Sequence, residues 1–474
     1  MPRLAAIILG ALFLIFIALQ FVGPRVTNPP VTADLVAPDD VKAVLATSCY
    51  NCHSNETHLW WYDRIAPASW LVARDVKRGR MHLNFSTFGQ LSPTAQKAML
   101  YESVNQMQLG AMPPKNYLLL HSEAKVTPEQ LDTLKKYLHP SNAITPASTE
   151  AIQSADSQYQ QWIAGGGSNI AKDVKPEFNG MAFLPDYKNW KTASSTERYD
   201  NGTMRVILGN DVAQKAIASG NVHPWPDGSA FAKVTFKQQP DASGNIWTGE
   251  FIQVELMLKD AQKYKSTEGW GFGRWRGADY KPYGKNANFT TECTSCHAPM
   301  KDNDFVYTMP IHDAPGEAFN STAVVPGPPP HQPGIDDQKF SGPLYQPLDW
   351  RVITSSVDHA HGTMSTLYGN DAAVDHARTS PQTPYPAGAV LAFVTWQQQE
   401  DKHWFGGRIP AAVNSVEFVS FRVHGLINDL GVSYESWTGS PLKKTSAGSE
   451  GGNIQTDIPP RIEAIGKMRA AVMP

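Results

Sequence analysis

The second half of the chain contains an internal repeat, and this repeat constrains the fold more than any other feature. NGTMRVILGNDVA at residues 201–213 matches HGTMSTLYGNDAA at residues 361–373, which is a shift of 160 residues. The same shift carries Trp190 onto Trp350 and the segment VTFKQQ onto VTWQQQ. Self-similarity over such a length indicates one structural unit that is present twice. The sequence therefore predicts two copies of one fold.

The length of 474 residues leaves room for further units besides the repeats. We expect an amino-terminal segment at 1–30, a first domain at 31–145, repeats at 180–315 and 346–474, and an extended Pro-rich linker at 316–345. The 41 Lys and Arg residues nearly balance the 44 Asp and Glu residues, and no basic run stands out. This balance argues against nucleic acid as a partner.

The amino-terminal segment is almost entirely apolar. An unbroken apolar run extends from Leu4 to Val22 after the single basic residue Arg3. Its 19 residues are about enough for a helix that crosses a bilayer, and no small-residue cleavage site follows it. We expect a helix that anchors the protein in the inner membrane, with a cleaved signal as the alternative. Both interpretations place the rest of the chain in the periplasm.

Cysteine occurs four times, always in the pattern C-x-x-C-H. The motifs are CYNCH, with Cys49, Cys52 and His53, and CTSCH, with Cys293, Cys296 and His297. This pattern is the attachment signature of c-type haem, in which both thiols bind the macrocycle and the histidine binds iron. A zinc site would have to join pairs that are far apart in the chain, and a thioredoxin-like pair would leave the histidine unused. We expect two covalently bound c-type haems.

The first domain reads as a small all-α unit around CYNCH. A helix is expected around residues 93–109, and another begins at TPEQLDTLKKYL, where Thr127 and Gln130 form a capping box. Between them, Met112 lies in the loop GAMPPKNY, which can present a thioether to iron as a sixth ligand. His82 of RMHLNFS is the rival ligand.

A lysine interrupts a strand of the first repeat. In GSAFAKVTFKQ, side chains alternate so that Lys233 shares one face with Phe231 and Thr235. A lone lysine on a strand most often faces water. However, the second repeat lacks the C-x-x-C-H motif and has Phe393 in place of this lysine. The paired loss favours a lysine that faces the haem.

Two stretches of the chain resemble known families. CYNCHSNET, IAPASWLVARDV and HLNFS resemble the small haem-binding domain of exported bacterial proteins. YKNW, PDGSAFAKV, GEFIQVELMLKD and CTSCHAPMKDNDFVYT, within residues 184–310, resemble the cytochrome P-460 family, whose members oxidise hydroxylamine. The resemblance implies a multidomain protein in which the all-α haem domain precedes two antiparallel β-rich (α+β) domains.

The second resemblance also implies roles for two residues. Lys233 matches the family's lysine that is covalently joined to the haem edge, and Glu255 matches a glutamate that assists proton removal at the open iron face. The related cytochromes c-prime-beta lack the cross-link and bind nitric oxide. Beyond this strand a shift of 157 residues aligns Trp247 with Trp404, and it places Ala412 at the position of Glu255 in the second repeat.

The functional expectation follows from these matches. Hydroxylamine, or a similar small nitrogen species, would be oxidised at the second haem, with Lys233 and Glu255 as the catalytic residues. Electrons would leave through the first haem to a periplasmic redox partner. The alternative is a non-catalytic dihaem protein that binds nitric oxide or carries electrons. The histidines of DHAHG, His359 and His361, lack a third metal ligand and are expected at the surface.

Overall fold

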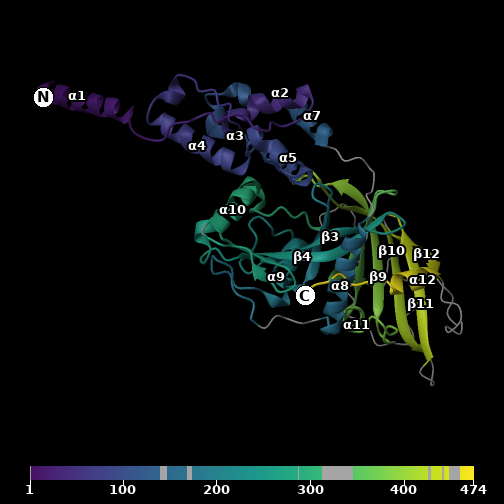
Figure 1. Ribbon diagram of the computed structural model, residues 1–474. Helices are drawn as coiled ribbons and strands as arrows, with labels where there is room; N and C mark the ends of the chain where they lie inside the picture. Colours follow the sequence, from purple (N-terminus) through teal and green to yellow (C-terminus); the bar gives the residue numbers. More distant parts are fainter. Residues whose placement is uncertain are drawn as a thin grey trace. The chain divides into compact units, whose positions relative to one another are not determined.

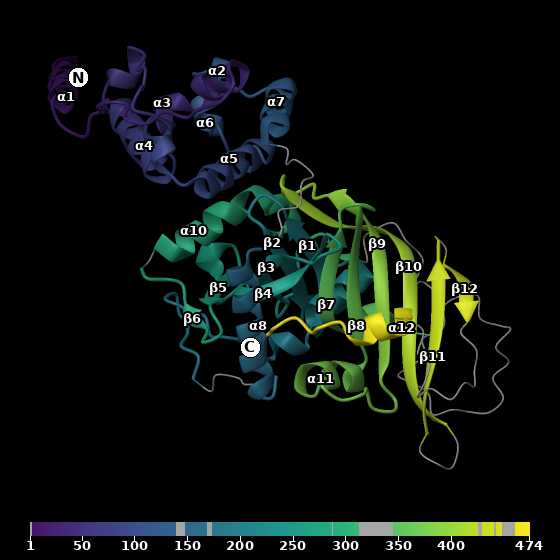
Figure 2. The same cartoon turned by 45° about the vertical axis from the view of Figure 1, so that its right-hand side comes forward.

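The computed structural model divides the chain into two compact units, residues 1–139 and residues 140–474 (Figures 1 and 2). The residues that the structure describes are 2–138, 147–167, 173–286, 288–311, 345–424, 429–439, 442–447 and 460–474. The expected linker at 316–345 lies outside the described residues up to residue 344.

The first unit is helical, as the sequence predicts. Its α-helices are α1 (Pro2–Leu19), α2 (Asp39–Ser48), α3 (Tyr50–His53), α4 (Ala68–His82), α5 (Pro93–Gln108), α6 (Lys115–Leu118) and α7 (Pro128–Leu138). Short 3-10 helices lie at η1 (Tyr62–Arg64), η2 (Phe85–Gln90) and η3 (Ser122–Ala124). Among the described residues of the whole chain, no helix combines the length and hydropathy needed to cross a membrane.

Two helices of the first unit begin where the sequence predicts. Ser92 caps α5 by accepting a hydrogen bond from the Ala95 N–H at 3.3 Å. The capping box of α7 is confirmed, because Thr127 N–H donates to Gln130 Oε1 at 2.9 Å and Gln130 N–H donates to Thr127 Oγ1 at 3.2 Å. These bonds satisfy amide groups that have no partner inside the helix.

Helix α4 crosses α3 at a glycine. A Cβ atom added to Gly79 would lie 2.5 Å from the carbonyl oxygen of Cys52, which is far closer than van der Waals contact. Glycine is therefore the residue that lets α4 approach the backbone of α3 at this point. The approach brings the end of α4 against the CYNCH segment.

The second unit begins with α8 (Thr149–Ala164) and is otherwise built on one antiparallel sheet of 12 strands. The strands of the first repeat are β1 (Lys191–Arg198), β2 (Thr203–Gly209), β3 (Ala230–Pro240), β4 (Asn245–Lys259), β5 (Trp270–Arg276) and β6 (Lys281–Pro282). Those of the second are β7 (Arg351–Asp358), β8 (Thr363–Gly369), β9 (Val390–Glu400), β10 (Gly407–His424), β11 (Asp429–Thr438) and β12 (Lys443–Ala447).

Helices complete the two repeats. The first has α9 (Asp211–Ser219) and α10 (Asn288–His297), the second has α11 (Asp371–Thr379) and α12 (Pro460–Gly466), and 3-10 helices lie at η4 (Pro185–Asn189), η5 (Lys265–Thr267), η6 (Ala298–Asn303) and η10 (Pro347–Asp349). The pairs β1 and β7, β2 and β8, α9 and α11, and β3 and β9 are each related by the predicted shift of 160 residues. The internal repeat is therefore present in the fold.

The two repeats share one closed sheet. Strand β4 pairs with β7, and β1 pairs with β10, so the order from β1 to β10 returns to its starting strand. Side chains such as Ala232, Val234 and Phe236, which are fully buried, belong to a core that contains residues of both repeats. Each repeat thereby covers the sheet edges that the other would leave open. Figure 2 shows the strands of both repeats side by side.

The strand register corrects the alignment of the repeats after β3. Lys233 pairs with Glu255 across β3 and β4, and Phe393 pairs with Glu417 across β9 and β10. The counterpart of Glu255 is therefore Glu417 and not Ala412. The error arose at the preceding hairpin turn, which spans residues 241–244 in the first repeat but 401–406 in the second. The turn of the second repeat is two residues longer than that of the first, whereas the shift of 157 residues required it to be three residues shorter.

Candidate functional site

Each C-x-x-C-H motif lies on a helical turn. Cys49 directly precedes α3, which ends at His53, and Cys293, Cys296 and His297 form the last part of α10. All four cysteines are free thiols. A single helical turn thus brings two thiols and one imidazole together at both predicted sites, as covalent haem attachment requires.

Hydrogen bonds orient both histidines for a metal. His297 Nδ1 lies 2.7 Å from the carbonyl oxygen of Phe305, and His53 Nδ1 lies 3.1 Å from the carbonyl oxygens of Gly79 and Leu83. A carbonyl oxygen can only accept, so Nδ1 carries the proton and Nε2 is left as the ligand atom. This arrangement is the usual support of a metal-binding histidine. The residues present therefore fit haem at both motifs.

Burial favours the uncharged forms of the cysteines and of His297. It raises the pKa of Cys49 to about 12, and that of Cys52 to about 11. Burial likewise raises the pKa of Cys293 to about 12, and it lowers the pKa of His297 to about 4. A neutral imidazole is the form that binds iron, so His297 is ready to act as a ligand.

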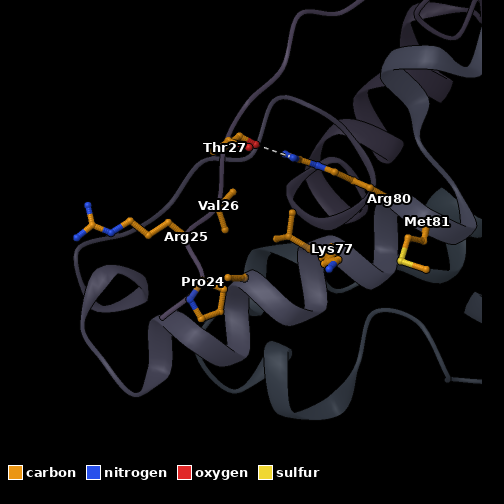
Figure 3. Close-up of a pocket in the computed structure, with 9 residues that line it drawn as sticks. Pro24, Arg25, Val26, Thr27, Lys77, Arg80 and Met81 are labelled. Atoms are coloured by element: carbon orange, nitrogen blue, oxygen red, sulfur yellow. Dashed lines mark hydrogen bonds between the residues drawn. The ribbon is translucent and has the colours of Figure 1, made fainter. Parts of the chain in front are cut away.

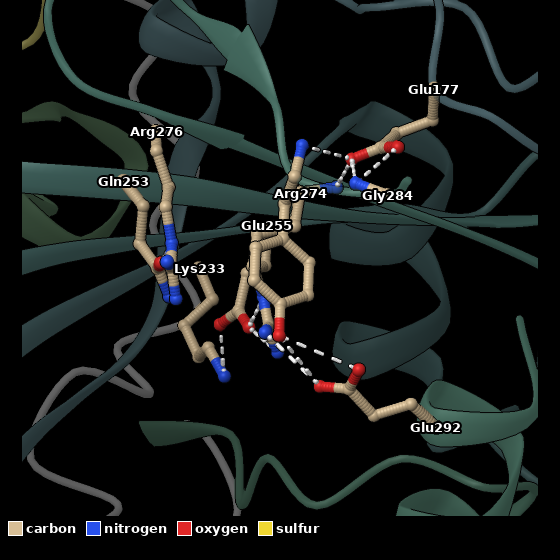
Figure 4. Close-up of polar contacts among 9 residues, drawn as sticks. Glu177, Lys233, Gln253, Glu255, Arg274, Arg276, Gly284 and Glu292 are labelled. Atoms are coloured by element: carbon tan, nitrogen blue, oxygen red, sulfur yellow. Dashed lines mark hydrogen bonds and ion pairs between the residues drawn. The ribbon is translucent and has the colours of Figure 1, made fainter. Parts of the chain in front are cut away.

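A cluster of charged side chains lies next to Glu292 of α10, the residue before the second motif (Figure 4). The Lys233 amine forms an ion pair with Glu255 Oε2, and Arg274 Nε of the neighbouring strand β5 donates to Glu255 Oε1 at 2.6 Å. Glu255 is 15% exposed and Lys233 is 34% exposed. The two predicted catalytic residues therefore lie together, one on each of two paired strands.

The cluster perturbs the ionisation of its members. Removal of the amine from water lowers the pKa of Lys233 to about 8, although the charge of Glu255 opposes this effect. Burial alone would raise the pKa of Glu255, but the positive charges of Lys233, Arg274 and Arg205 hold it well below its usual range. The charges of Lys233, Glu255 and Arg274 also act on the pKa of His297, so the cluster lies close to the haem motif.

Three residues connect this cluster to α10, and the sequence reasoning missed them. The Arg274 guanidinium carbon lies 4.5 Å from the centre of the Tyr283 ring, and Tyr283 Oη lies 3.3 Å from Glu292 Oε1. Glu292 directly precedes Cys293. These contacts join β4 and β5 to α10, the helix that contains the second C-x-x-C-H motif. Only the register of β4 with β5 places Arg274 opposite Glu255, and no sequence motif marks that register.

The second repeat keeps the glutamate but loses the cations around it. The register places Phe393, Ser436 and Ser365 where the first repeat has Lys233, Arg274 and Arg205. In their place Arg461 of α12 binds Glu417, with Nε 2.7 Å from Oε2, and its guanidinium lies 5.2 Å from the Phe393 ring centre. Helix α12 therefore fills the region that corresponds to the Lys233 cluster.

The sixth ligand of the first motif stays a prediction. Met112 follows the turn after α5 and is 41% exposed, and His82 is the last residue of α4 and is exposed. Burial lowers the pKa of His53, and the charge of His82 lowers it further, so His82 lies near the motif. Neither side chain has an observed contact that assigns it to iron.

A separate cavity of about 370 Å³ lies along α4 (Figure 3). Its lining includes three basic side chains, Arg25, Lys77 and Arg80, and Arg80 Nη1 donates to the carbonyl oxygen of Thr27 at 2.6 Å. None of the predicted iron ligands lines this cavity.

The histidines of DHAHG bind different carboxylates. His359 Nε2 lies 2.5 Å from Glu197 Oε1, and His361 Nδ1 lies 2.6 Å from Asp358 Oδ2. Glu197 is fully buried between the repeats, so His359 serves the contact between them rather than the surface. Within the described ranges, no group of three or more His, Cys, Asp or Glu side chains could hold a metal ion.

Parts of the chain match two known protein families. Residues 14–140 match the family described as haem-binding domain. Residues 184–308 and 345–448 match the family described as cytochrome P460. No curated protein matches the sequence.

Proposed function

Residues 184–308 and 345–448 belong to the cytochrome P460 family and residues 14–140 to the haem-binding domain family, and on this basis we propose a dihaem c-type cytochrome. In this proposal the haem at Cys293 and Cys296 oxidises hydroxylamine or a similar small nitrogen species. The observation that supports it most is the Lys233–Glu255–Arg274 cluster beside His297.

Four residues would hold the second haem. Cys293 and Cys296 would form thioethers, His297 Nε2 would bind iron, and the Lys233 amine would bond to the ring edge. When bound, the haem supplies an iron site for the nitrogen compound and accepts its electrons. The pKa of Lys233, lowered to about 8, favours the covalent bond, because an amine reacts through its neutral form. The bond would replace an N–H bond of the amine and a C–H bond of the ring edge, and the two electrons and two protons released would pass to a two-electron oxidant such as a peroxide.

Glu255 is the proposed proton acceptor. Loss of electrons from an N–H or O–H compound releases protons, and Glu255 Oε2 is the buried carboxylate oxygen that faces Lys233. While Lys233 is charged, the low pKa of Glu255 makes it a weak base. An amine bonded to the ring edge would carry less positive charge, and the pKa of Glu255 would rise toward its ordinary value. Arg274 would keep the carboxylate oriented.

Electron transfer and location complete the proposal. The first haem, held by Cys49, Cys52 and His53, would pass electrons to a periplasmic redox partner. Covalent attachment at two motifs and the apolar amino-terminal run support an exported protein, with that run retained as an inner-membrane anchor or removed. The intact mass of the mature protein distinguishes the two fates and counts the haems.

Hydroxylamine turnover with an artificial electron acceptor tests the proposed reaction. Protein matured in a host with cytochrome c assembly is compared with Glu255→Gln and with Glu417→Gln, its counterpart in the haemless repeat. We expect Glu255→Gln to reduce kcat roughly 100-fold or more, which is typical for the loss of a general base. Glu417→Gln should leave kcat per folded protein unchanged.

Two results would contradict the proposal. Wild-type protein with both haems attached but no turnover would make it a binder of nitric oxide or an electron carrier. Equal turnover in Glu255→Gln and the wild type would remove Glu255 from the reaction.

A further inference from the structure

The haemless repeat contacts the haem-bearing repeat through its longer hairpin turn, residues 401–406. His403 Nδ1 lies 2.7 Å from the carbonyl oxygen of Tyr307. The rings of Trp404 and Tyr307 meet edge to face, with their centres 5.7 Å apart. Because a carbonyl only accepts, His403 donates this hydrogen bond. The turn therefore holds Tyr307 at both its backbone and its ring.

Tyr307 in turn lies directly against the second C-x-x-C-H motif. Its hydroxyl donates to the carbonyl oxygen of Cys296 at 2.6 Å, and its ring is 5.3 Å from the His297 ring at an angle of 80°. The Phe272 ring, 5.0 Å away, is a further neighbour of the imidazole. Tyr307 therefore helps to fix the plane of His297, in addition to its contact with Cys296.

The same short segment controls the hydrogen bond of His297. The carbonyl oxygen that accepts from His297 Nδ1 belongs to Phe305, two residues before Tyr307. Phe305 has a φ of 65° and Asp304 a φ of 44°, which is the left-handed region that non-glycine residues rarely adopt. Such a conformation persists only when its surroundings hold it. Asp304 is tied to Lys259 Nζ at 2.8 Å, and the other end is held by the contacts of Tyr307.

Trp404 is itself held by residues of the first repeat. Its Nε1 donates to Asp200 Oδ2 at 3.3 Å, and the Arg198 guanidinium carbon lies 4.3 Å from the centre of its ring. Arg198 and Asp200 form a buried ion pair, with 6% and 4% of their side-chain surface exposed. Contacts on two sides therefore fix the indole of Trp404. The ring that packs against Tyr307 has little freedom to move.

We propose that His403 and Trp404 are positioning residues for the haem at Cys293 and Cys296. They hold Tyr307, and through it the orientation and hydrogen bond of His297, which set the basicity of this iron ligand. This gives the haemless repeat a role at the haem of the other repeat. The proposal rests on the haem attachment in the proposed function but not on its substrate.

The experiment measures the ligand field of the second haem in the full-length protein. Trp404→Leu and His403→Leu are compared with the wild type by the midpoint potential of this haem and by the iron–histidine stretching frequency of its ferrous form. Without the contacts of His403 and Trp404 to Tyr307, the hydrogen bond from His297 Nδ1–H to the Phe305 carbonyl oxygen should weaken. The imidazole then becomes a less basic ligand. We therefore expect the potential to rise and the stretching frequency to fall in both variants.

Two further variants serve as controls. His403→Asn keeps an N–H donor near the Tyr307 carbonyl and should restore both values toward those of the wild type. Trp247→Leu removes an indole next to the shorter hairpin turn of the first repeat, where Trp247 Nε1 donates to Asp241 Oδ2 at 2.8 Å, and it should change neither value. If Trp404→Leu acted only through a general loss of packing, Trp247→Leu would change the potential and the stretching frequency as well.

The outcomes separate this inference from the proposed function. Unchanged potential and stretching frequency in Trp404→Leu and His403→Leu, with the haem attached, would overturn the inference and leave the reaction standing. Should Trp404→Leu fail to fold, the comparison of His403→Leu with His403→Asn still decides. A wild-type protein whose mass shows no haem at Cys293 would overturn the proposed function and this inference with it.

Discussion

At the scale of single residues, Lys233 is the strongest link between sequence and chemistry. Its amine lies against Glu255 beside the second haem motif, and the counterpart in the haemless repeat is Phe393. We expect Lys233→Ala to keep the haem attached through Cys293 and Cys296. The variant should lose the red-shifted Soret band of a cross-linked haem, together with most hydroxylamine oxidation, because the bond to the ring edge cannot form. Absorption spectra and mass spectrometry of haem peptides measure these changes.

A conservative variant sharpens this test. Lys233→Arg keeps the positive charge that pairs with Glu255, but its guanidinium stays protonated and cannot form the same bond. It should therefore resemble Lys233→Ala in its spectrum. Recovery of the wild-type Lys233 peptide free of haem, from protein that still oxidises hydroxylamine, would refute the cross-link.

The residues of the site differ in how far the sequence reveals them. The cysteines and histidines of the two C-x-x-C-H motifs can be recognised in the sequence, since haem attachment requires them at a fixed spacing in the chain. Arg274 and Tyr283 meet Glu255 and Glu292 only through strand pairing, so local sequence carries no signal for them. Arg461 is even harder to predict from the sequence. It lies on the carboxy-terminal helix α12, and it contacts Glu417 and Phe393 at the position where the second repeat has lost the lysine of the first.

At the scale of elements, the packing of α4 on α3 depends on one glycine. A methyl group at residue 79 would meet the Cys52 carbonyl oxygen at 2.5 Å, so Gly79→Ala must push α4 away from the first haem motif. We expect a loss of roughly 1–3 kcal/mol in the stability of the first unit. The hydrogen bonds from His53 to Gly79 and Leu83 should also weaken. Thermal unfolding monitored at the first haem measures the effect.

The same helix offers a matched control for this change. Arg78 is exposed on α4, so Arg78→Ala removes a side chain there without touching the interface with α3. Its unfolding midpoint should stay near that of the wild type. An unfolding midpoint of Gly79→Ala equal to that of Arg78→Ala would show that the helices can separate at no cost.

Elements whose residues contact close neighbours in the sequence could be predicted. Features that depend on the pairing of strands could not. The capping box of Thr127 and Gln130 specifies the start of α7 by contacts within one turn, and the structure confirms it. The counterpart of Glu255 was predicted wrongly, because alignment through Trp247 and Trp404 required a turn three residues shorter in the second repeat, whereas that turn is two residues longer. A change in turn length moves every later residue along the partner strand.

At the scale of the whole molecule, the repeat predicted two copies of one fold but not that they close one sheet. Closure depends on β4 with β7 and on β1 with β10, pairings between edges that no sequence motif marks. It also indicates what the second repeat contributes to the first. The fully buried Glu197 of the first repeat takes most of its side-chain partners from the second, since Gln398 Nε2 donates to it at 2.8 Å and His359 lies 2.5 Å away.

A chain that ends after residue 311 should therefore not fold as a monomer. It keeps the haem motif and the Lys233 cluster, but it exposes the edges of β1 and β4 and leaves Glu197 with Gln238 as its remaining observed side-chain partner. Breaking a buried charged contact of this kind costs about 3–5 kcal/mol, a large part of the stability of a typical domain. Open strand edges also pair readily with other chains. We expect aggregates or self-associated species by size-exclusion chromatography with light scattering.

Cleavage of the full-length protein between residues 311 and 345 provides the control for truncation. The cut chain keeps every strand pairing and the partners of Glu197, so its two pieces should elute together with the spectrum of the intact protein. If truncation instead yields a folded monomer with that spectrum, the second repeat is dispensable for the fold. If the cut pieces separate under native conditions, the paired edges are too weak to hold the repeats together. Either result would contradict a single closed sheet as the folding unit, whereas co-elution of the cut pieces and self-association of the truncated chain support it.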